Sequence, residues 1–191
     1  REEYVVYGSM DGGLHVVNAA SGKEASVFVP DETLSNQPET LVNSDASGAL
    51  AYGVDAPWAA DNTFKVEASG SATKYIARTM NIYGGLRMGG NALYGLDIST
   101  PASPSLKFKN TPETEGFSRL GQIWSKPVIT NIRVKGEVKK VLIFGGGYDE
   151  TVFEDGANKV KNVTNVTKGN ARYIADASNG TLLWSVSSSN T

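Results

Sequence analysis

The chain has 191 residues, of which 40% are hydrophobic and 20% are charged, and it contains no cysteine. This length and apolar content allow one large or two small cores, and they exclude a disordered tail. Proteins that bind nucleic acids usually gain affinity when an excess of Lys and Arg displaces counterions from the phosphates. With a net charge of −2 the chain has no such excess, so we predict no nucleic-acid partner. Without cysteine there is no disulfide framework, thiolate nucleophile or cysteine-based zinc site.

Glycine is frequent, at 21 residues, and valine, isoleucine, threonine and tyrosine recur along the chain. This composition favours short strands joined by tight turns over long helices, and we predict an all-β fold. No apolar run approaches the ~18 residues of a membrane span, so we predict none. Arg1 leads directly into the strand-like run 4–7, and we therefore expect the chain to begin inside a folded region.

In chain order, a hairpin motif recurs three times. It begins at Leu14, Leu93 and Arg172, so that successive copies are 79 residues apart. Each copy ends in Asn or Asp followed by a turn, where the side chain can bond backbone amides two residues on. Short apolar runs follow the turns, at 25–29, 106–108 and 182–186. A motif at constant spacing predicts one antiparallel hairpin used three times.

Two further strand-like segments precede each of the later hairpins. Residues 54–61 parallel residues 124–130, and residues 75–80 parallel residues 141–144. Four strands per repeat are typical of a propeller blade, whose faces pack against neighbouring blades. We predict a partial β-propeller made of four-stranded antiparallel blades with short helical or loop insertions. Since propellers close with ~4 to 8 blades, we expect sequence outside this chain to complete the fold.

We predict a single propeller domain over residues 1–191, divided into three parts. Residues 1–30 would be the last strands of one blade, residues 31–110 a second blade, and residues 111–191 a third. Insertions at 31–52 and 149–169 explain why the repeat exceeds the ~40 to 50 residues of common propeller families. The first insertion carries helix-start signals at Asp31 and Pro38. Such insertions usually gather on one face, where we expect a partner to bind.

The segment 7–24 resembles the blade motif of quinoprotein-like propellers, and more closely the propeller of the PilC/PilY-type tip adhesins of bacterial type IV pili. Further landmarks follow in that family's order, at 52–55, 84–97, 120–128 and 144–148. The resemblance implies an exported, non-catalytic binding platform at the bacterial cell surface, pilus tip or outer membrane. It also implies roles in surface attachment, pilus biogenesis and twitching motility.

The same resemblance implies minor pilins at the pilus tip and a host or abiotic surface as partners. Members of the family carry a Ca²⁺-binding loop of EF-hand type. The two acidic segments closest to that pattern, 61–64 and 149–152, supply too few carboxylates at ligand spacing. We therefore predict no metal or cofactor in this stretch, with calcium possible elsewhere in a longer parent protein.

The alternative is a pyrroloquinoline-quinone dehydrogenase propeller or a generic scaffold propeller. The dehydrogenase needs a carboxylate base beside a Ca²⁺-bound quinone in a central funnel, and this chain has too few blades to enclose one. A hydrolytic triad is disfavoured because the single histidine, His15, lies inside a predicted strand. We predict no catalytic, cofactor-binding or metal-binding residue, and we assign no partner-binding residue.

Two other patterns have both a structural and a functional interpretation. Trp58, Trp124 and Trp184 lie near strand ends, which favours packing between blades over stacking on sugars. The glycine-rich run 84–90 leads into a strand, not a helix, so a turn or loop is favoured over a phosphate cradle.

Overall fold

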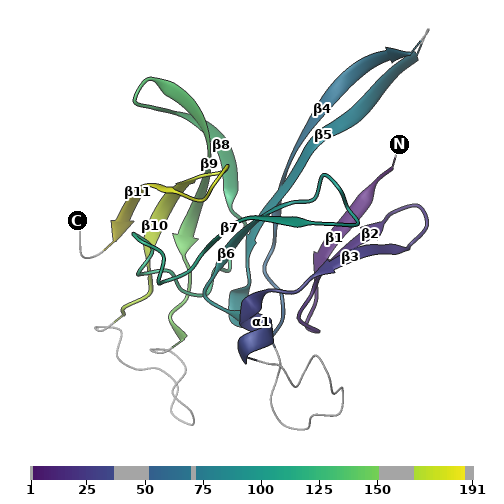
Figure 1. The fold of residues 1–191 in the computed structure, drawn as a ribbon. Coiled ribbons are helices and arrows are strands. Elements are labelled where there is room, and N and C mark those ends of the chain that lie inside the picture. Colours follow the sequence, from purple (N-terminus) through teal and green to yellow (C-terminus); the bar gives the residue numbers. More distant parts are fainter. Residues whose placement is uncertain (1, 37–51, 70–71, 151–165, 188–191) are drawn as a thin grey trace.

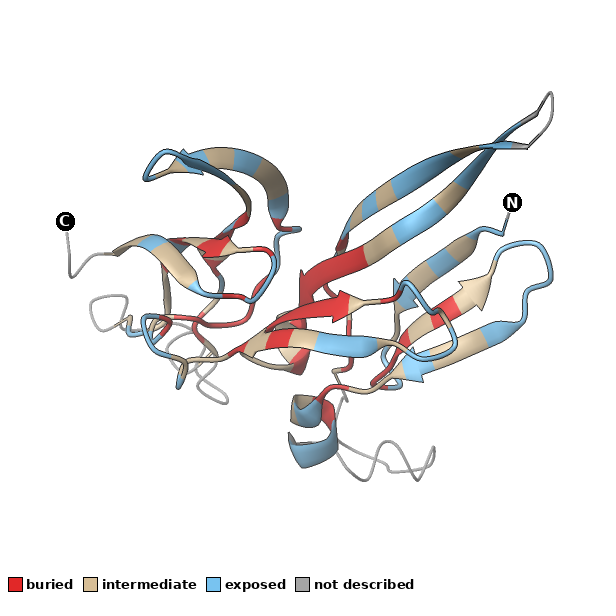
Figure 2. Cartoon of the chain, turned by 45° about the horizontal axis from the view of Figure 1, so that its top comes forward, coloured by how far each residue is buried: buried red, intermediate tan, exposed pale blue. Residues whose placement is uncertain are grey.

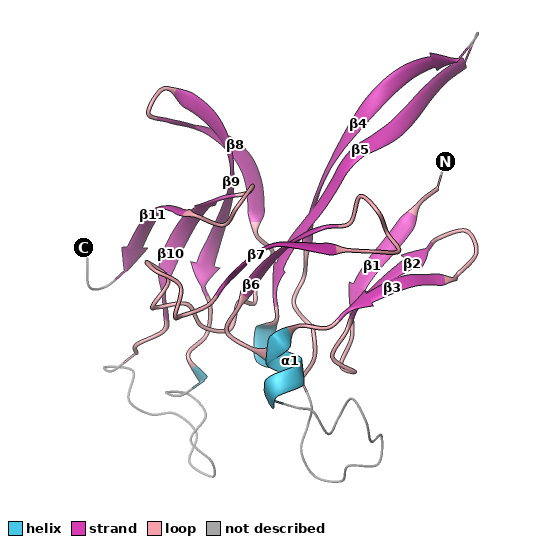
Figure 3. Cartoon of the chain, in the orientation of Figure 1, coloured by secondary structure: helices cyan, strands magenta, loops and turns pink. Residues whose placement is uncertain are grey.

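The computed structural model describes residues 2–36, 52–69, 72–150 and 166–187. These residues form three antiparallel sheets of three, four and four strands (Figures 1 and 3). The all-β prediction is confirmed. In the described segments, no helix is long and apolar enough to cross a membrane.

The first sheet contains β1 (Tyr4–Gly8), β2 (Leu14–Asn18) and β3 (Glu24–Phe28). The second contains β4 (Ala59–Ser69), β5 (Ala72–Gly85), β6 (Leu93–Asp97) and β7 (Ser105–Asn110). The third contains β8 (Val128–Val134), β9 (Glu137–Gly146), β10 (Gly169–Asp176) and β11 (Leu182–Ser187). Each sheet is a simple meander, in which strands adjacent in sequence are adjacent in space.

The three predicted hairpins are confirmed, and each lies in a different sheet. They are β2–β3, β6–β7 and β10–β11, all with antiparallel register. The four strands expected in each of the later repeats are also present. The closure of a propeller and the boundaries at residues 30 and 110 stay predictions.

Strands β4 and β8 begin later than the sequence indicated. The segments 54–58 and 124–127 lead up to the strands and do not start them, because β4 begins at Ala59 and β8 at Val128. Each segment contains a proline, Pro57 or Pro127, close to the strand start. Proline has no amide hydrogen and is confined to strand ends and edges, so the ladder starts after it.

Short helical segments lie outside the sheets. Helix α1 (Asp31–Asn36) follows β3, which confirms the helix-start signal at Asp31. The signal at Pro38 lies outside the described residues. The 3-10 helix η1 (Arg87–Gly89) follows β5, so the glycine-rich run ends one strand and turns toward β6, as expected.

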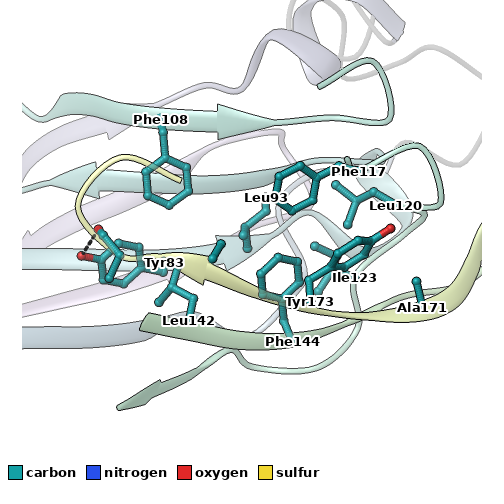
Figure 4. Close-up of a cluster of buried hydrophobic side chains, with 12 residues drawn as sticks. Tyr83, Leu93, Phe108, Phe117, Leu120, Ile123, Leu142, Phe144, Ala171 and Tyr173 are labelled. Carbon is teal, nitrogen blue, oxygen red and sulfur yellow. Dashed lines mark hydrogen bonds between the residues drawn. The ribbon is translucent and has the colours of Figure 1, made fainter. Parts of the chain in front are cut away.

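Near its base the second sheet is buried on both faces, and Figure 2 shows buried residues gathered where it meets its neighbours. One cluster joins it to the first sheet and includes Leu14, Ile82 and Tyr94. The other joins it to the third sheet and includes Tyr83, Leu93, Phe117, Phe144 and Tyr173, which Figure 4 shows in close-up. The strands of the second sheet therefore alternate between two cores.

The tryptophans divide between core and surface. Trp58 packs against the core between the first and second sheets, beside Gly84, where a Cβ atom would lie 2.4 Å from the indole ring. Trp124 and Trp184 are 44% and 51% exposed, so the packing between blades predicted for them is not seen among the described residues. Trp184 lies in β11, at the edge of the third sheet, and Trp124 lies before β8 with Arg87 above its ring.

The aromatic core between the second and third sheets gives a stability prediction. Phe117 is 1% exposed and packs against Phe144 and Tyr173, with ring centroids 6.4 and 5.0 Å away. We expect Phe117→Ala to lower the free energy of unfolding by about 3–5 kcal/mol, because it leaves a cavity. Phe64→Ala is the matched control, since Phe64 is 50% exposed. Equal losses for both variants in urea unfolding would contradict this core assignment.

Candidate functional site

The roots of both predicted insertions lie at the same end of the sheets. Helix α1 opens the first insertion, and the segments after β9 and before β10 frame the second (Figure 1). Most of both insertions, at 37–51 and 151–165, lies outside the described residues. We define the insertion face by the described segments around these roots: 31–36, 52–55, 87–91, 148–150 and 166–168.

Helix α1 is tied to the second sheet by charged and polar side chains. The Tyr94 hydroxyl donates a hydrogen bond to Glu32. Lys109 Nζ lies 2.9 Å from Asp31 Oδ2 and 3.2 Å from Glu32 Oε1. Burial and the neighbouring Glu32 raise the pKa of Tyr94, so the phenol stays protonated and keeps donating. The first insertion therefore starts from a fixed base.

The second insertion is closed at its root by Asp149, which is only 1% exposed. Its Oδ2 atom accepts hydrogen bonds from the backbone amides of Thr167 and Lys168, each 3.0 Å away. Glu150 accepts a hydrogen bond of 2.9 Å from Asn91, in the loop before β6. Asp149 thus joins the two ends of the insertion, as a side chain bonded to local backbone often does in loops.

Between the two roots lies Arg87, held in a strained conformation. Its φ of 55° is in the left-handed region, which is uncommon for a residue with a side chain. Its guanidinium lies 4.0 Å above the Trp124 ring and 3.3 Å from Asp55. Strained residues of this kind are concentrated at functional sites, although structural causes also occur.

Buried polar atoms without a partner are also found on this face. Among the described residues, five on the insertion face have a buried side-chain atom with no hydrogen-bond partner: Thr33 Oγ1, Asp55 Oδ1, Arg87 Nε, Asn91 Oδ1 and Glu150 Oε2. Burial of an unpaired polar group is unfavourable, so such atoms mark places where another polar group can bind. Together with the insertions, they make this face the candidate interaction site.

His15 lies in β2 as predicted, but its neighbours were not expected. Ser9 Oγ is 3.0 Å from Nε2, and Glu24 Oε2 is 2.7 Å from Nδ1, which is the order of groups in a hydrolytic triad. Asp11 competes for Nε2 at 3.3 Å and also accepts the hydrogen bond of Ser9. The surrounding amides are already bonded, since Ser9 N donates to Gly13 O and Gly13 N donates to Asp11. Because Asp11 accepts the Ser9 hydrogen, Ser9 does not donate to His15 as the nucleophile of a triad does, and the cluster ties the β1–β2 turn to β2 and β3.

The side chains that fix the two insertion roots were not predictable from local sequence patterns. Lys109 and Asn91 reach across 77 and 59 residues of sequence to Glu32 and Glu150, and no local pattern reports such pairs. The 61–64 segment considered for calcium lies in β4, where Asp61 is paired with Lys140. Within the described residues, no three His, Cys, Asp or Glu side chains are grouped to hold a metal ion. The absence of a metal from the chain stays a prediction.

Known proteins similar to this chain are pilus factors. No family model matches it. It is 30% identical over 171 residues to a "Type IV pilus biogenesis factor PilY1 homolog" of Xylella fastidiosa, covering 89% of this chain and 12% of that protein. It is 28% identical over 148 residues to "Type IV pilus biogenesis factor PilY1" of Pseudomonas aeruginosa, covering 78% of this chain and 12% of that protein. The chain therefore spans about an eighth of these relatives.

Among solved structures, the chain is similar to the crystal structure of the Pseudomonas aeruginosa PilY1 C-terminal domain. The TM-score is 0.58 at 22% identity, and the match covers 98% of this chain and 30% of that one. At this identity the likeness supports the fold.

The His15 cluster predicts a pH dependence of stability. The hydrogen bond with Glu24, together with Asp11, raises the pKa of His15 above its ordinary 6.5 in the folded chain. The stabilisation is then fully present below pH 6.5 and is lost as the pH rises through the raised pKa. We expect the urea midpoint to fall over that range in the native chain but not in His15→Gln. A parallel fall in His15→Gln would show that another group is responsible.

Proposed function

We propose that this chain, which belongs to the PilY1 type IV pilus biogenesis factor family over its C-terminal domain region, is part of a β-propeller that acts as a non-catalytic binding platform. The observation that carries the proposal is the rooting of two long insertions at one end of a stack of sheets. Rigid scaffolds that present loops on one face commonly use those loops to bind partners.

The propeller part of the proposal is supported by the way the repeat packs. Leu14 of the first sheet and Leu93 of the second are equivalent positions, and each packs onto the following sheet. Tyr94 and Tyr173 are also equivalent, and each packs onto the preceding sheet. The same positions thus form both interfaces. A unit that repeats its packing in this way can be extended at either end.

The outward face of the third sheet has the pattern of a face that another sheet covers. Register places Val128, Ile143, Ile174 and Trp184 in one row across the four strands. The equivalent row of the second sheet is Ala59, Tyr83, Gly95 and Phe108. That second row is buried against the third sheet, whereas Val128 and Trp184 are 57% and 51% exposed.

The first sheet has a matching open face on its other side. Val5 and Tyr7 of β1 are 51% and 47% exposed, and they pair with Val17 and His15. His15 is the repeat equivalent of Tyr94, which faces the preceding sheet. Apolar side chains that are exposed together on one face of a sheet can mark an interface. We propose that a preceding and a following sheet, in sequence beyond this chain, cover these two faces.

This stacking gives a prediction for the whole polypeptide that contains residues 1–191. We expect Ile143→Lys to destabilise it by roughly 2 kcal/mol or more, because a charge would be buried in the covered face. Val138→Lys is the control: Val138 is 65% exposed near the tip of the β8–β9 hairpin and should tolerate the charge. If thermal unfolding shows no difference between the two variants, the outward face of the third sheet is not covered.

For the location and partners, the proposal follows the family. We propose export to the cell surface and a position at the pilus, with pilus-tip minor pilins and host or abiotic surfaces as partners. Surface attachment, pilus biogenesis and twitching motility are the activities that this platform would support. The unpaired polar atoms of Asp55, Arg87 and Glu150 favour a polar partner surface.

Replacement of both insertions tests whether the insertion face binds partners. Residues 37–51 and 151–165 are replaced by short Gly-Ser linkers in the whole polypeptide, which is returned to a piliated bacterium lacking its own copy. We expect most surface attachment and twitching to be lost, while the thermal stability of the protein is kept because the core is unchanged. The control inserts the same linker at residues 70–71, between the end of β4 and the start of β5. Normal attachment and motility without either insertion would contradict a binding role for the insertion face.

A further inference from the structure

A polar groove of about 350 Å³ lies between the second and third sheets, away from the insertion face. It is found on the side from which the long β4–β5 and β8–β9 hairpins project (Figure 1). Its charged lining comes from both sheets: Asp61, Lys107, Lys139, Lys140 and Asp176. The volume lies near the lower end of the ~300–1,000 Å³ typical of small-molecule sites.

The three lysines of the groove are not equally neutralised. Lys140 Nζ is bonded to both carboxylate oxygens of Asp61, at 2.8 and 2.7 Å. Lys139 Nζ is 3.7 Å from Asp176 Oδ2, which is too long for a hydrogen bond. Lys107 lies within electrostatic reach of Asp97 but is in no ion pair of 4 Å or less with a described residue. Lys107 is therefore the ammonium group of the groove most available to an anion, and Lys139 could add a second contact because its ion pair with Asp176 is long.

The floor of the groove is neutral and polar. Burial, and then the negative charges of Asp61, Asp97 and Asp176, raise the pKa of Tyr83 to about 12. Its hydroxyl therefore stays protonated, and it donates a hydrogen bond of 2.9 Å to the carbonyl of Ala177. This bond holds the β10–β11 turn against the second sheet and fixes one wall of the groove.

Hydroxyl and amide groups add further hydrogen-bonding capacity. Asn81 is 7% exposed, and its Oδ1 atom has no partner among the described residues. The hydroxyls of Thr63 and Thr79 are 2.5 Å apart, and since only one of them donates in that bond, the other keeps a free hydrogen. The groove thus combines unpaired positive charge with hydroxyl and amide groups.

We propose that this groove binds a sugar that carries one carboxylate, such as a hexuronic acid at the end of an acidic glycan. The carboxylate would pair with Lys107 and Lys139, and the sugar hydroxyls would donate to Asn81 and to the carboxylates of Asp61 and Asp176. Those two carboxylates repel strongly charged anions such as phosphate groups. A neutral sugar would leave Lys107 unpaired. The groove lies on a different surface from the insertion face, so a test of one site does not decide the other.

The test titrates glucuronate, glucose and inorganic sulfate separately into the whole polypeptide, with binding followed by calorimetry and saturation-transfer NMR. We expect saturable millimolar binding of glucuronate, weaker binding of sulfate and none of glucose. Lys107→Gln and Lys139→Gln should each weaken glucuronate binding roughly tenfold, because each removes one charged partner of the carboxylate. Lys23→Gln, at an exposed lysine in the β2–β3 turn, is the matched control and should change nothing.

Three results would overturn the proposal. They are the absence of saturable glucuronate binding, equal affinity for sulfate and glucuronate, and undiminished binding in both groove variants. Equal affinity for sulfate would identify the groove as a general anion patch. The folding of each variant is checked by thermal unfolding, and Lys107 is in no close ion pair with a described residue whose loss would destabilise the chain.

Discussion

The burial of the second sheet on both of its faces is the constraint on which the rest of the structure depends. Neighbouring residues of β5 and β6 point to opposite cores, so Ile82 packs toward the first sheet and Tyr83 toward the third. A slip of one residue would exchange the two sets, and the register is therefore strongly fixed. At Gly95, a Cβ atom would lie 2.5 Å from the Phe108 ring, so even the smallest side chain is excluded. Glycine at this position leaves room for the Phe108 ring of the neighbouring strand β7 to lie across β6.

This packing explains how polar groups can remain unpaired on the insertion face. A buried acceptor such as Asp55 Oδ1 or Asn91 Oδ1 lowers stability, and so does the left-handed backbone of Arg87. Two apolar cores can offset these losses without change to the loops. The ion pairs of Lys109 and the bonds to Asp149 then place the insertion roots in fixed positions. Rigidity of the base lowers the entropy lost when a loop binds a partner.

The strands and hairpins could be predicted from the sequence because they depend on residues that are close together in the chain. The spacing of 79 residues between Leu14, Leu93 and Arg172 and the alternation along each strand depend on neighbours within a hairpin. The sites were not predictable in the same way. Ser9 and Glu24 meet His15 only through the register of three strands, and Lys140 meets Asp61 only when two sheets pack. The exposure of Trp184 depends on which sheets are present, and no single-residue pattern reports that.

At the groove, one position of the repeat carries a charged residue where the equivalent position in the previous repeat carries an apolar one. By register, Lys140 is the equivalent of Met80, which packs into the core between the first and second sheets. At the next interface the same position carries an ammonium group bonded to Asp61. A partly exposed ion pair contributes little to stability, and an apolar pair packs at least as well. Holding the sheets together therefore does not explain the charged version. The charged version is what the proposed ligand site would need, because Asp61, held in place by Lys140, is one of the carboxylates that would accept the sugar hydroxyls.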